Sequence, residues 1–350
     1  MMITLGTVAR GRDNNLNLIR MIAATAVLVS HAWPINLGPR VEEPLKQVFG
    51  QSLGTLAVYV FFAISGFLIT ASFQRTARTK RFVAARMLRL FPGLAVSLLL
   101  VALLLGPLVT VLPLDVYFSL RETWSFLFAN VTLAFPQFTL PGVFSDNPFP
   151  AVEGSIWTLI HEALCYVMVL VVGLCGLLTG RRIWIFLGLY ALGWAATVLF
   201  PSLFPPRLLT LQNLSLPFVL GMMGWLWRDR IVLSLWGVVV LIFAWALLRT
   251  TPAGLPALCL MIAYGVAWLA YVPGGWLRAY NRLGDYSYGV YIYAFPIQGL
   301  VVWLFGPLSP ALHVALALPP TLLVSILSWH LVEKPAMGWL NRPAKAAAQA

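Results

Sequence analysis

Long apolar runs separated by short polar segments make up most of the chain. Each run contains about 18 to 24 residues, which is enough for a helix to cross a bilayer. The sequence therefore predicts an all-α polytopic membrane protein with about ten transmembrane helices. These cover approximately residues 16–36, 54–74, 90–112, 155–178, 183–200, 208–227, 231–248, 254–272, 285–305 and 311–331.

Composition agrees with this pattern. Of the 350 residues, 60% are hydrophobic and only 10% are charged, whereas soluble domains carry about 25% charged residues. The first apolar run is too long for the core of a signal peptide, so we expect it to be retained as a span. We predict one integral-membrane domain over residues 1–350, with its spans within about 16–335 and a short cytoplasmic tail at 336–350.

Basic residues are distributed unevenly along the chain, which has a formal net charge of +12. With the N-terminus in the cytoplasm, 18 of the 23 lysines and arginines fall on cytoplasmic segments. The positive-inside rule therefore predicts that both termini are cytoplasmic. Because the basic excess indicates topology, the lipid bilayer is a predicted partner and nucleic acid is not.

One apolar stretch, residues 124–136, is short for a span and ends at Pro136. If it crossed the membrane, every later loop would change sides, and Arg181 and Arg182 would lie outside. We therefore predict a short amphipathic or re-entrant piece at the outer interface. The rest of the segment before the fourth span is predicted to form an outer lid or rim with the acidic residues Asp115, Glu122, Asp146 and Glu153.

The three cysteines have none of the spacings typical of metal ligands. Cys165, Cys175 and Cys259 fall inside predicted spans, so we expect buried, inert thiols. The chain also lacks phosphate-loop, dinucleotide, HExxH and GxSxG patterns. Candidate chemistry therefore lies in the ionisable residues of the spans, which are costly in a bilayer without a function or a partner.

Arg20 and His31 are eleven positions apart in the first span. At about 100° and about 1.5 Å per residue, they share one helix face and differ by roughly 16 Å in depth. An imidazole can take and return a proton near neutral pH, which activation of a hydroxyl nucleophile requires. We predict His31 as a general base; the alternative is a histidine that joins helices by hydrogen bonds.

Arg86 and Arg89 precede the third span and share a helix face. Two guanidinium groups so placed suit a phosphate or pyrophosphate, and with Arg20 they would form an anion site open to the cytoplasm. The alternative is a positive-inside anchor that also binds anionic lipid headgroups. In the second span, Ser65 and Gly66 allow the close approach of another backbone or of a thin ligand.

The fourth span carries Glu162 about 10 Å below the outer surface, close to the predicted depth of His31. A carboxylate there would orient the imidazole and stabilise its protonated form, or would pair with an arginine. Tyr166 shares a helix face with Glu162, whereas His161, the rival base, points about 100° away.

The ninth span combines Ser287, four tyrosines and Pro296, which predicts a kinked, polar-lined helix beside a cavity. The earlier tyrosines could instead belong to the aromatic belt at the membrane surface. At the end of the last span, Pro335 is expected to stop the helix and Glu333 to pair with an inner arginine as a structural contact.

Six short motifs occur in the same order as in a known family. They are Arg20 with His31, residues 61–69, Arg86 with Arg89 before Pro92, residues 157–162 with Tyr166, residues 287–291 with Pro296, and residues 333–335. Together they make the chain resemble the integral-membrane acyltransferase-3 family, the O-acyltransferases of bacterial surface polysaccharides. Two positions depart from the family pattern, because Ala294 stands where histidine is frequent and Asn17 where aspartate is common.

The resemblance implies that His31 is the essential base and that the acyl donor is cytoplasmic acetyl-CoA or another acyl-CoA. It also implies transfer to an acceptor on the far side of the membrane, and no metal is expected. The predicted catalytic residues are His31 and Glu162, the donor-binding residues are Arg20, Arg86, Arg89 and Ser65, and the acceptor-binding residues are Trp157, Tyr166, Ser287 and Tyr288.

We therefore predict an O-acyltransferase of the bacterial cytoplasmic (inner) membrane. It would move an acetyl or other short acyl group to a hydroxyl of an extracytoplasmic saccharide or surface glycan. The main alternative is a proton-coupled transporter of an envelope metabolite, because intramembrane Arg, His and Glu also serve transport, although the sequence shows no inverted repeat. A non-catalytic lipid-binding or assembly partner in an envelope complex is the third possibility, and His31 would be dispensable in it.

Overall fold

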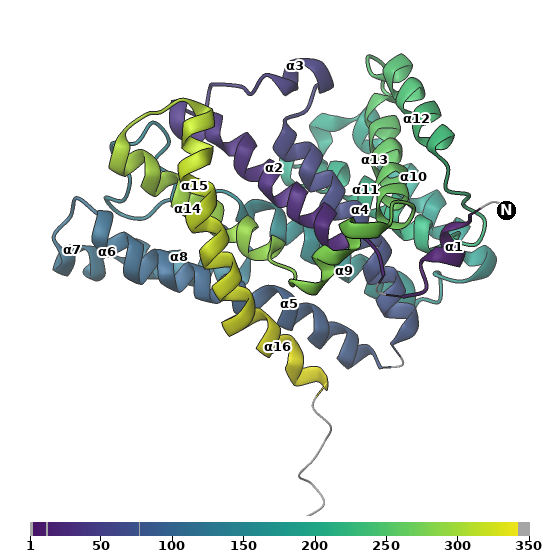
Figure 1. Ribbon diagram of the computed structural model, residues 1–350, viewed down its shortest axis with the longest axis horizontal. Coiled ribbons are helices and arrows are strands. Elements are labelled where there is room, and N and C mark those ends of the chain that lie inside the picture. The colour runs from purple at the N-terminus through teal and green to yellow at the C-terminus, as the bar shows by residue number, and fades with distance from the viewer. Residues whose placement is uncertain (1–2, 12, 77, 342–350) are drawn as a thin grey trace, which may run out of the picture. The chain divides into compact units, whose positions relative to one another are not determined.

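The structure is a computed structural model that describes residues 3–11, 13–76 and 78–341. Helices dominate these residues, as Figure 1 shows, and the β-structure within them is one isolated bridge between Thr4 and Val232. The predicted all-α fold class is confirmed.

Nine helical stretches among the described residues are long and apolar enough to cross a membrane. This finding agrees with the predicted polytopic architecture. The stretches are α2 (Leu16–Leu37), α4 (Leu53–Arg75), α5 with η1 and α6 (Thr79–Val109), η2 with α9 (Ile156–Leu174), η3 with α10 (Gly180–Leu199), α11 (Pro206–Leu226), α13 (Gly254–Tyr271), α14 (Ser287–Phe305) and α15 with η6 and α16 (Pro310–Gly338).

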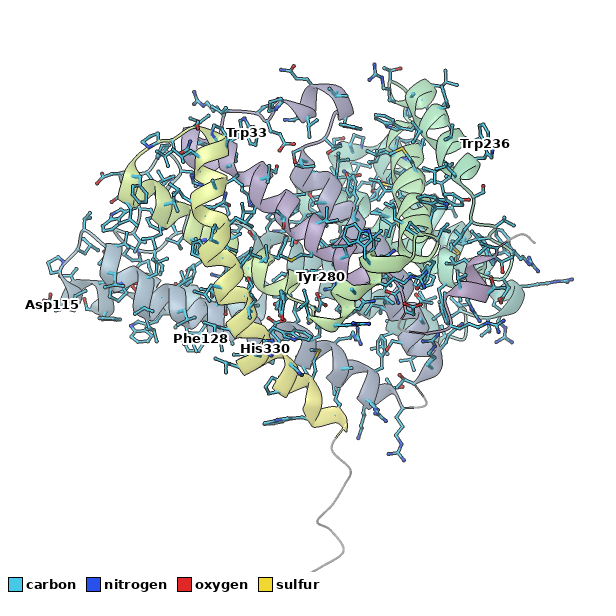
Figure 2. All side chains as sticks on the ribbon, viewed as in Figure 1. Trp33, Asp115, Phe128, Trp236, Tyr280 and His330 are labelled. Atoms are coloured by element: carbon cyan, nitrogen blue, oxygen red, sulfur yellow. The ribbon has the colours of Figure 1, made fainter. Side chains whose placement is uncertain are left out.

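Shorter helices connect or flank these stretches. They are α1 (Leu5–Val8), α3 (Leu45–Phe49), α7 (Leu114–Ser119), α8 (Arg121–Thr132), η4 (Pro201–Leu203), α12 (Leu235–Leu248), η5 (Gly275–Arg282) and η7 (Trp339–Asn341). Large apolar side chains are exposed on several of them, such as Phe128 on α8 and Trp236 on α12 (Figure 2). Apolar surface of this kind is typical of contact with lipid.

The predicted seventh span is shorter than expected. Helix α12 has 14 residues, or about 21 Å, which is less than the roughly 30 Å of a hydrocarbon core. The residues before it are extended because they pair with the N-terminal segment. Leu5 N donates to the Ile231 carbonyl, and Leu233 N donates to the Ile3 carbonyl, each at 2.8 Å. Backbone groups used in this pairing cannot also form a helix.

The chain divides into two compact units. Unit 1 comprises Met1–Arg20, Val58–Thr79 and His161–Leu283, and unit 2 comprises Met21–Ala57, Lys80–Ile160 and Gly284–Ala350. The single domain predicted over residues 1–350 stays a prediction. Within the predicted tail at 336–350, residues 342–350 lie outside the described part of the chain.

Unit 1 contains a very close contact between α4 and α11. A Cβ atom added at Gly66 would lie 1.9 Å from the Phe218 carbonyl oxygen, and one added at Gly221 would lie 2.0 Å from the Ala63 carbonyl oxygen. Side chains larger than hydrogen cannot occupy that space, so the two glycines allow the backbones to touch. The close backbone approach predicted at Gly66 is confirmed.

Unit 2 contains α14, the most buried of the candidate spans, which runs antiparallel to α15 (Figure 1). Within α14, Pro296 has no N–H and leaves the Ile292 carbonyl without its helical donor. The Ser97 hydroxyl, from α5, donates to that carbonyl at 3.5 Å. The carbonyl that Pro296 frees therefore faces a protein hydroxyl.

Residues 124–136 contain the greater part of α8, which ends at Thr132. This helix buries Phe126 and Asn130 and exposes Phe128, so it is amphipathic as predicted. Its place at the outer membrane interface stays a prediction.

Two local expectations are wrong. Cys175 is exposed because α9 ends at Leu174, whereas Cys165 and Cys259 are buried as expected. Pro335 does not stop the last helix, because the π-helical turn η6 (Trp329–Glu333) leads directly into α16 (Lys334–Gly338). Pro335 occupies the first turn of α16, where its missing N–H and fixed φ are compatible with a helix.

Candidate active site

His31 lies in the C-terminal half of α2, in unit 2, with its side chain partly buried. The Phe295 ring of α14 meets the imidazole edge-on, with the ring centroids 5.3 Å apart. One turn before His31, the Leu28 carbonyl accepts a hydrogen bond from Gln298 Nε2 at 2.9 Å. Helix α14 is thereby fixed beside the imidazole. His31 Nδ1 is buried and has no hydrogen-bond partner among the described residues. Buried polar atoms are normally hydrogen-bonded, so this nitrogen is a candidate for contact with a bound molecule.

The segment before α9 packs against the same face of α14. The Tyr291 hydroxyl donates to the Ser155 carbonyl at 2.7 Å and shares a second hydrogen bond with the Thr158 hydroxyl. A Cβ atom added at Gly154 would lie 2.3 Å from the Phe295 ring. Because Tyr291 and Phe295 are four residues apart on one helix, they place Gly154 on the ring that also contacts His31.

Glu153 begins this segment and is completely buried. Its Oε1 accepts a hydrogen bond from Ser155 N at 3.3 Å, while its Oε2 and the Ser155 hydroxyl are buried without a partner among the described residues. Burial raises the pKa of Glu153 well above its ordinary value, because desolvation favours the neutral acid. The expectation that Glu153 belongs to an outer acidic rim is therefore wrong, because the Gly154 contact draws the segment into the interior of unit 2.

Arg89 lies on α5 within a buried ion-pair cluster of unit 2. Its guanidinium is 2.6 Å from Asp285 Oδ2 and 3.3 Å from Glu333 Oε2. The rings of Tyr288 and Trp329 lie within 6 Å of the same guanidinium. The predicted pairing of Glu333 with an arginine is confirmed, while its place on the inner side stays a prediction. Two carboxylates together offset the charge of Arg89. Arg86, one turn earlier on α5, is half-buried.

Ser287 and Tyr288 complete this cluster. The Ser287 hydroxyl donates to Asp285 Oδ1 at 2.6 Å, and the Tyr288 hydroxyl donates to the Leu90 carbonyl at 2.7 Å. Both side chains therefore hold α5 against the start of α14. The contact of Arg89 with Asp285 could not be predicted from the local pattern, since the two residues are 196 positions apart and meet only through folding.

Glu162 has its partners in unit 1. Its Oε1 accepts a hydrogen bond from the Ser65 hydroxyl at 3.0 Å and another from the Tyr166 hydroxyl. The predicted shared face of Glu162 and Tyr166 is confirmed. Ser65 was predicted next to the acyl donor, and that contact stays a prediction. Two hydroxyl donors on one oxygen fix the position of the carboxylate.

The remaining predicted residues are distributed between the units. Arg20 closes the first segment of unit 1 and lies over the Phe61 ring at 6.0 Å. Trp157, in unit 2, is 38% exposed. Helix α2 is continuous from Leu16 to Leu37, so Arg20 and His31 do share one helix. The proposed contact of Glu162 with His31 stays a prediction. Within the described residues, no three His, Cys, Asp or Glu side chains gather as metal ligands would.

Comparison with known proteins indicates the class of reaction that this protein catalyses. The family profile of the acyltransferase-3 domain, described as an acyltransferase domain, matches residues 13–330. The chain is 29% identical to an "O-acetyl transferase" of Shigella phage Sf6, over 92% of this chain and 96% of the relative. It is also 29% identical to "Nodulation protein 10" of Rhizobium leguminosarum bv. viciae, over 93% of this chain and 94% of the relative.

No solved structure matches the chain at a significant level. The family match covers nearly all the candidate spans and includes every predicted site residue. This multi-pass membrane protein therefore belongs to the acyltransferase-3 family and is an acyltransferase.

Proposed function

We propose that the protein transfers an acetyl or other short acyl group from cytoplasmic acyl-CoA to a hydroxyl of an extracytoplasmic saccharide, with His31 as the general base. The observation that carries this proposal is the His31 imidazole, which has a buried, unpartnered Nδ1 beside Phe295 in a chain of an acyltransferase family. An unprotonated ring nitrogen without a protein partner can accept the proton of an incoming hydroxyl.

The proposed reaction requires an acceptor hydroxyl, an acyl thioester and a base that takes the proton of the hydroxyl. His31 takes the proton from the acceptor hydroxyl as its oxygen attacks the acyl carbonyl and forms the new C–O bond. The tetrahedral intermediate breaks its C–S bond, and the departing CoA thiolate takes the proton back from the imidazolium. The products are the ester and free CoA, and the imidazole returns to its neutral form.

Charged residues have supporting parts in this proposal. Because two carboxylates already offset Arg89, we assign the donor phosphates mainly to Arg20 and Arg86, while Arg89 joins α5 to Asp285 and Glu333. Glu162 accepts two hydroxyl hydrogen bonds, and in this proposal its carboxylate stabilises the imidazolium of His31. Ser65 would hold that carboxylate in place.

The acceptor side of the proposal includes Trp157 and Tyr166. Ser287 and Tyr288 are bonded within the Arg89 cluster, so their predicted contact with the acceptor stays a prediction. The name of the phage relative favours acetyl as the acyl group and a hydroxyl oxygen as the acceptor atom. A donor made in the cytoplasm and an acceptor on the outer side require the protein to lie in the bacterial cytoplasmic membrane. The acceptor in this proposal is a sugar or surface glycan.

The test measures acyl-CoA consumption by the purified full-length protein in detergent, with surface glycan extracted from bacteria that express the protein added as the acceptor. We expect free CoA to appear with the wild type, and the rate to fall by about 10²–10⁴-fold in His31→Gln. His330→Gln is the matched control, because His330 is an exposed histidine of the same unit (Figure 2). Mass spectrometry of surface glycans from cells that carry each variant reports transfer to the natural acceptor.

Two results would overturn the proposal. One is full CoA release and full glycan acylation by folded His31→Gln protein. The other is an absence of acyl-CoA consumption by wild-type protein that nevertheless restores an envelope phenotype, which is the behaviour expected of a transporter.

A further inference from the structure

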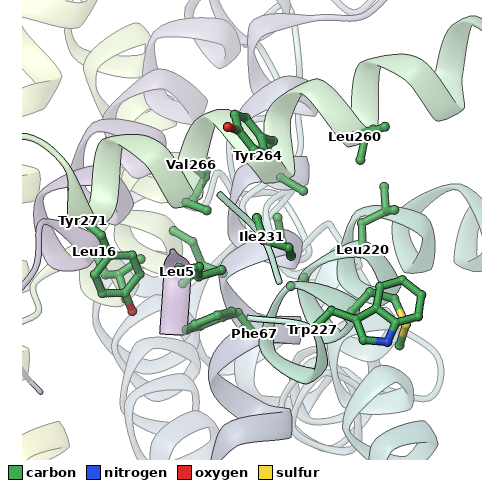
Figure 3. A pocket seen from close by; sticks show the side chains of 17 residues that line it. Leu5, Leu16, Phe67, Leu220, Trp227, Ile231, Leu260, Tyr264, Val266 and Tyr271 are labelled. Atoms are coloured by element: carbon green, nitrogen blue, oxygen red, sulfur yellow. The ribbon is translucent and has the colours of Figure 1, made fainter. Parts of the chain in front are cut away.

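Unit 1 contains an apolar pocket that the proposed reaction does not use. Its cavity volume is about 190 Å³, which exceeds the roughly 150 Å³ of an engineered apolar cavity that takes up benzene. Figure 3 shows side chains from α1, α4, α11 and α13 around it, among them Leu5, Phe67, Leu220 and Leu260. The walls are almost entirely aliphatic and aromatic, so the pocket suits a hydrocarbon.

The pocket is elongated along α13. Leu260 lines one end and Tyr271 lines the other (Figure 3), and eleven helical residues span about 16 Å. This length is suited to a stretch of acyl chain. In the predicted topology, the Tyr271 end is the one that faces the cytoplasmic surface.

The Tyr271 end is polar and positively charged. Tyr271 is buried, and its hydroxyl makes no hydrogen bond within the described part of the chain. Arg75, at the end of α4, interacts electrostatically with that hydroxyl. Arg75 also stacks on the Trp225 ring at 4.7 Å, and Trp225 packs edge-on against the pocket residue Phe67 at 5.4 Å.

A second guanidinium stacks on the same indole. Arg228 lies 4.1 Å from the Trp225 ring centroid, and its Nη1 donates to the Trp225 carbonyl at 2.8 Å. The exposed carboxylate of Asp229, 4.0 Å from Arg228, offsets part of this charge. Two arginines at one end of a hydrocarbon pocket complement a molecule with an anionic head and an apolar tail.

We infer that this pocket binds one acyl chain of an anionic phospholipid from the cytoplasmic leaflet, with the phosphate of its headgroup at Arg75 and Arg228. The Tyr271 hydroxyl supplies a hydrogen-bond donor between the acyl chain and the headgroup phosphate. None of the proposed catalytic residues lines the pocket, so the inference does not depend on the proposed acyl transfer.

The test uses purified, delipidated full-length protein in detergent micelles. Dioleoyl phosphatidylglycerol and dioleoyl phosphatidylcholine are added in turn, and native mass spectrometry measures bound lipid. We expect phosphatidylglycerol to bind at least tenfold more tightly. Its affinity should fall about fivefold for each of Arg75→Gln and Arg228→Gln, whereas Arg181→Gln with Arg182→Gln should leave it unchanged. These two controls are exposed arginines of unit 1.

A second variant fills the pocket without a change of charge. Ala267→Phe adds a ring to the pocket wall and should abolish retention of phosphatidylglycerol. Leu269→Phe, at a 48% exposed position of the same helix, is the matched control and should bind as the wild type does.

Three outcomes would overturn the inference. They are equal affinity for the two lipids, unchanged phosphatidylglycerol binding by folded Ala267→Phe, and competitive displacement of the lipid by a long-chain acyl-CoA. The last would assign the pocket to the acyl donor. CoA release by wild-type protein, measured in the same samples, keeps a failure of this inference distinct from a failure of the proposed function.

Discussion

Arg89 illustrates how a charged side chain can be accommodated next to an apolar span. Its ion pairs join α5 to Asp285 before α14 and to Glu333 in η6. Glu333 is itself nearly inaccessible, and the Ser328 hydroxyl donates to its second oxygen at 3.1 Å. A buried ion pair contributes little compared with apolar packing, but loss of one partner leaves an uncompensated buried charge. The cluster is therefore sensitive to removal of Arg89.

We expect Arg89→Gln to destabilise the protein by about 3–5 kcal/mol, measured by thermal unfolding of the purified protein in detergent. Arg78→Gln, at an exposed position, should change stability by no more than about 0.5 kcal/mol. Addition of Asp285→Asn to Arg89→Gln should recover part of the loss, because one of the two carboxylates that lost Arg89 becomes neutral. Wild-type stability of Arg89→Gln would show that the cluster does not hold these elements together.

At the scale of elements, helix contacts depend on small residues as much as on apolar ones. Between α4 and α11, Gly66 and Gly221 face carbonyl groups of the opposite helix with no space for a methyl group. Lipid tails are as apolar as the helices, so close van der Waals contact has to supply the attraction between them. Ser65, next to Gly66 in α4, donates to Glu162, so α4 takes part both in this helix contact and in the candidate site.

We expect Gly66→Ala to destabilise the protein by about 1–3 kcal/mol, because the added methyl group forces the two backbones apart. Gly188→Ala on α10 is the matched control, since a Cβ atom there meets nothing within 4 Å. It should be neutral or stabilise by roughly 0.5–1 kcal/mol. Thermal unfolding of both variants in detergent is the measurement, and equal effects would contradict the steric explanation.

At the scale of the whole molecule, the predicted topology determines which phase reaches each end of the candidate site. Cys175 provides a test because it is exposed, whereas Cys165 and Cys259 are buried. In a Cys165→Ala, Cys259→Ala background, Cys175 should resist a membrane-impermeable maleimide in intact spheroplasts and react after permeabilisation. Cys175→Ala with Ser145→Cys in this background places a thiol on a predicted outer loop, which should react in intact spheroplasts. Reaction of Cys175 without permeabilisation would refute cytoplasmic termini.

Much of the fold could be predicted because each span satisfies its own backbone hydrogen bonds and meets the bilayer through its own side chains. Hydropathy is therefore a local property, and nine of the predicted spans correspond to long apolar helices among the described residues. The exception, at residues 231–248, depended on pairing between Leu5 and Ile231. A partner more than 200 positions away leaves no trace in the local pattern.

The sequence by itself determined the helical, multi-pass architecture, the motif order that indicates the family, and local pairs such as Glu162 with Tyr166, because these follow from periodicity within one helix. Only the tertiary structure decided that Arg89 is bound by Asp285 and Glu333, and that Glu153 is buried. The physical reason is that the energy of a buried charge depends on its neighbours in space, and folding alone brings those neighbours together.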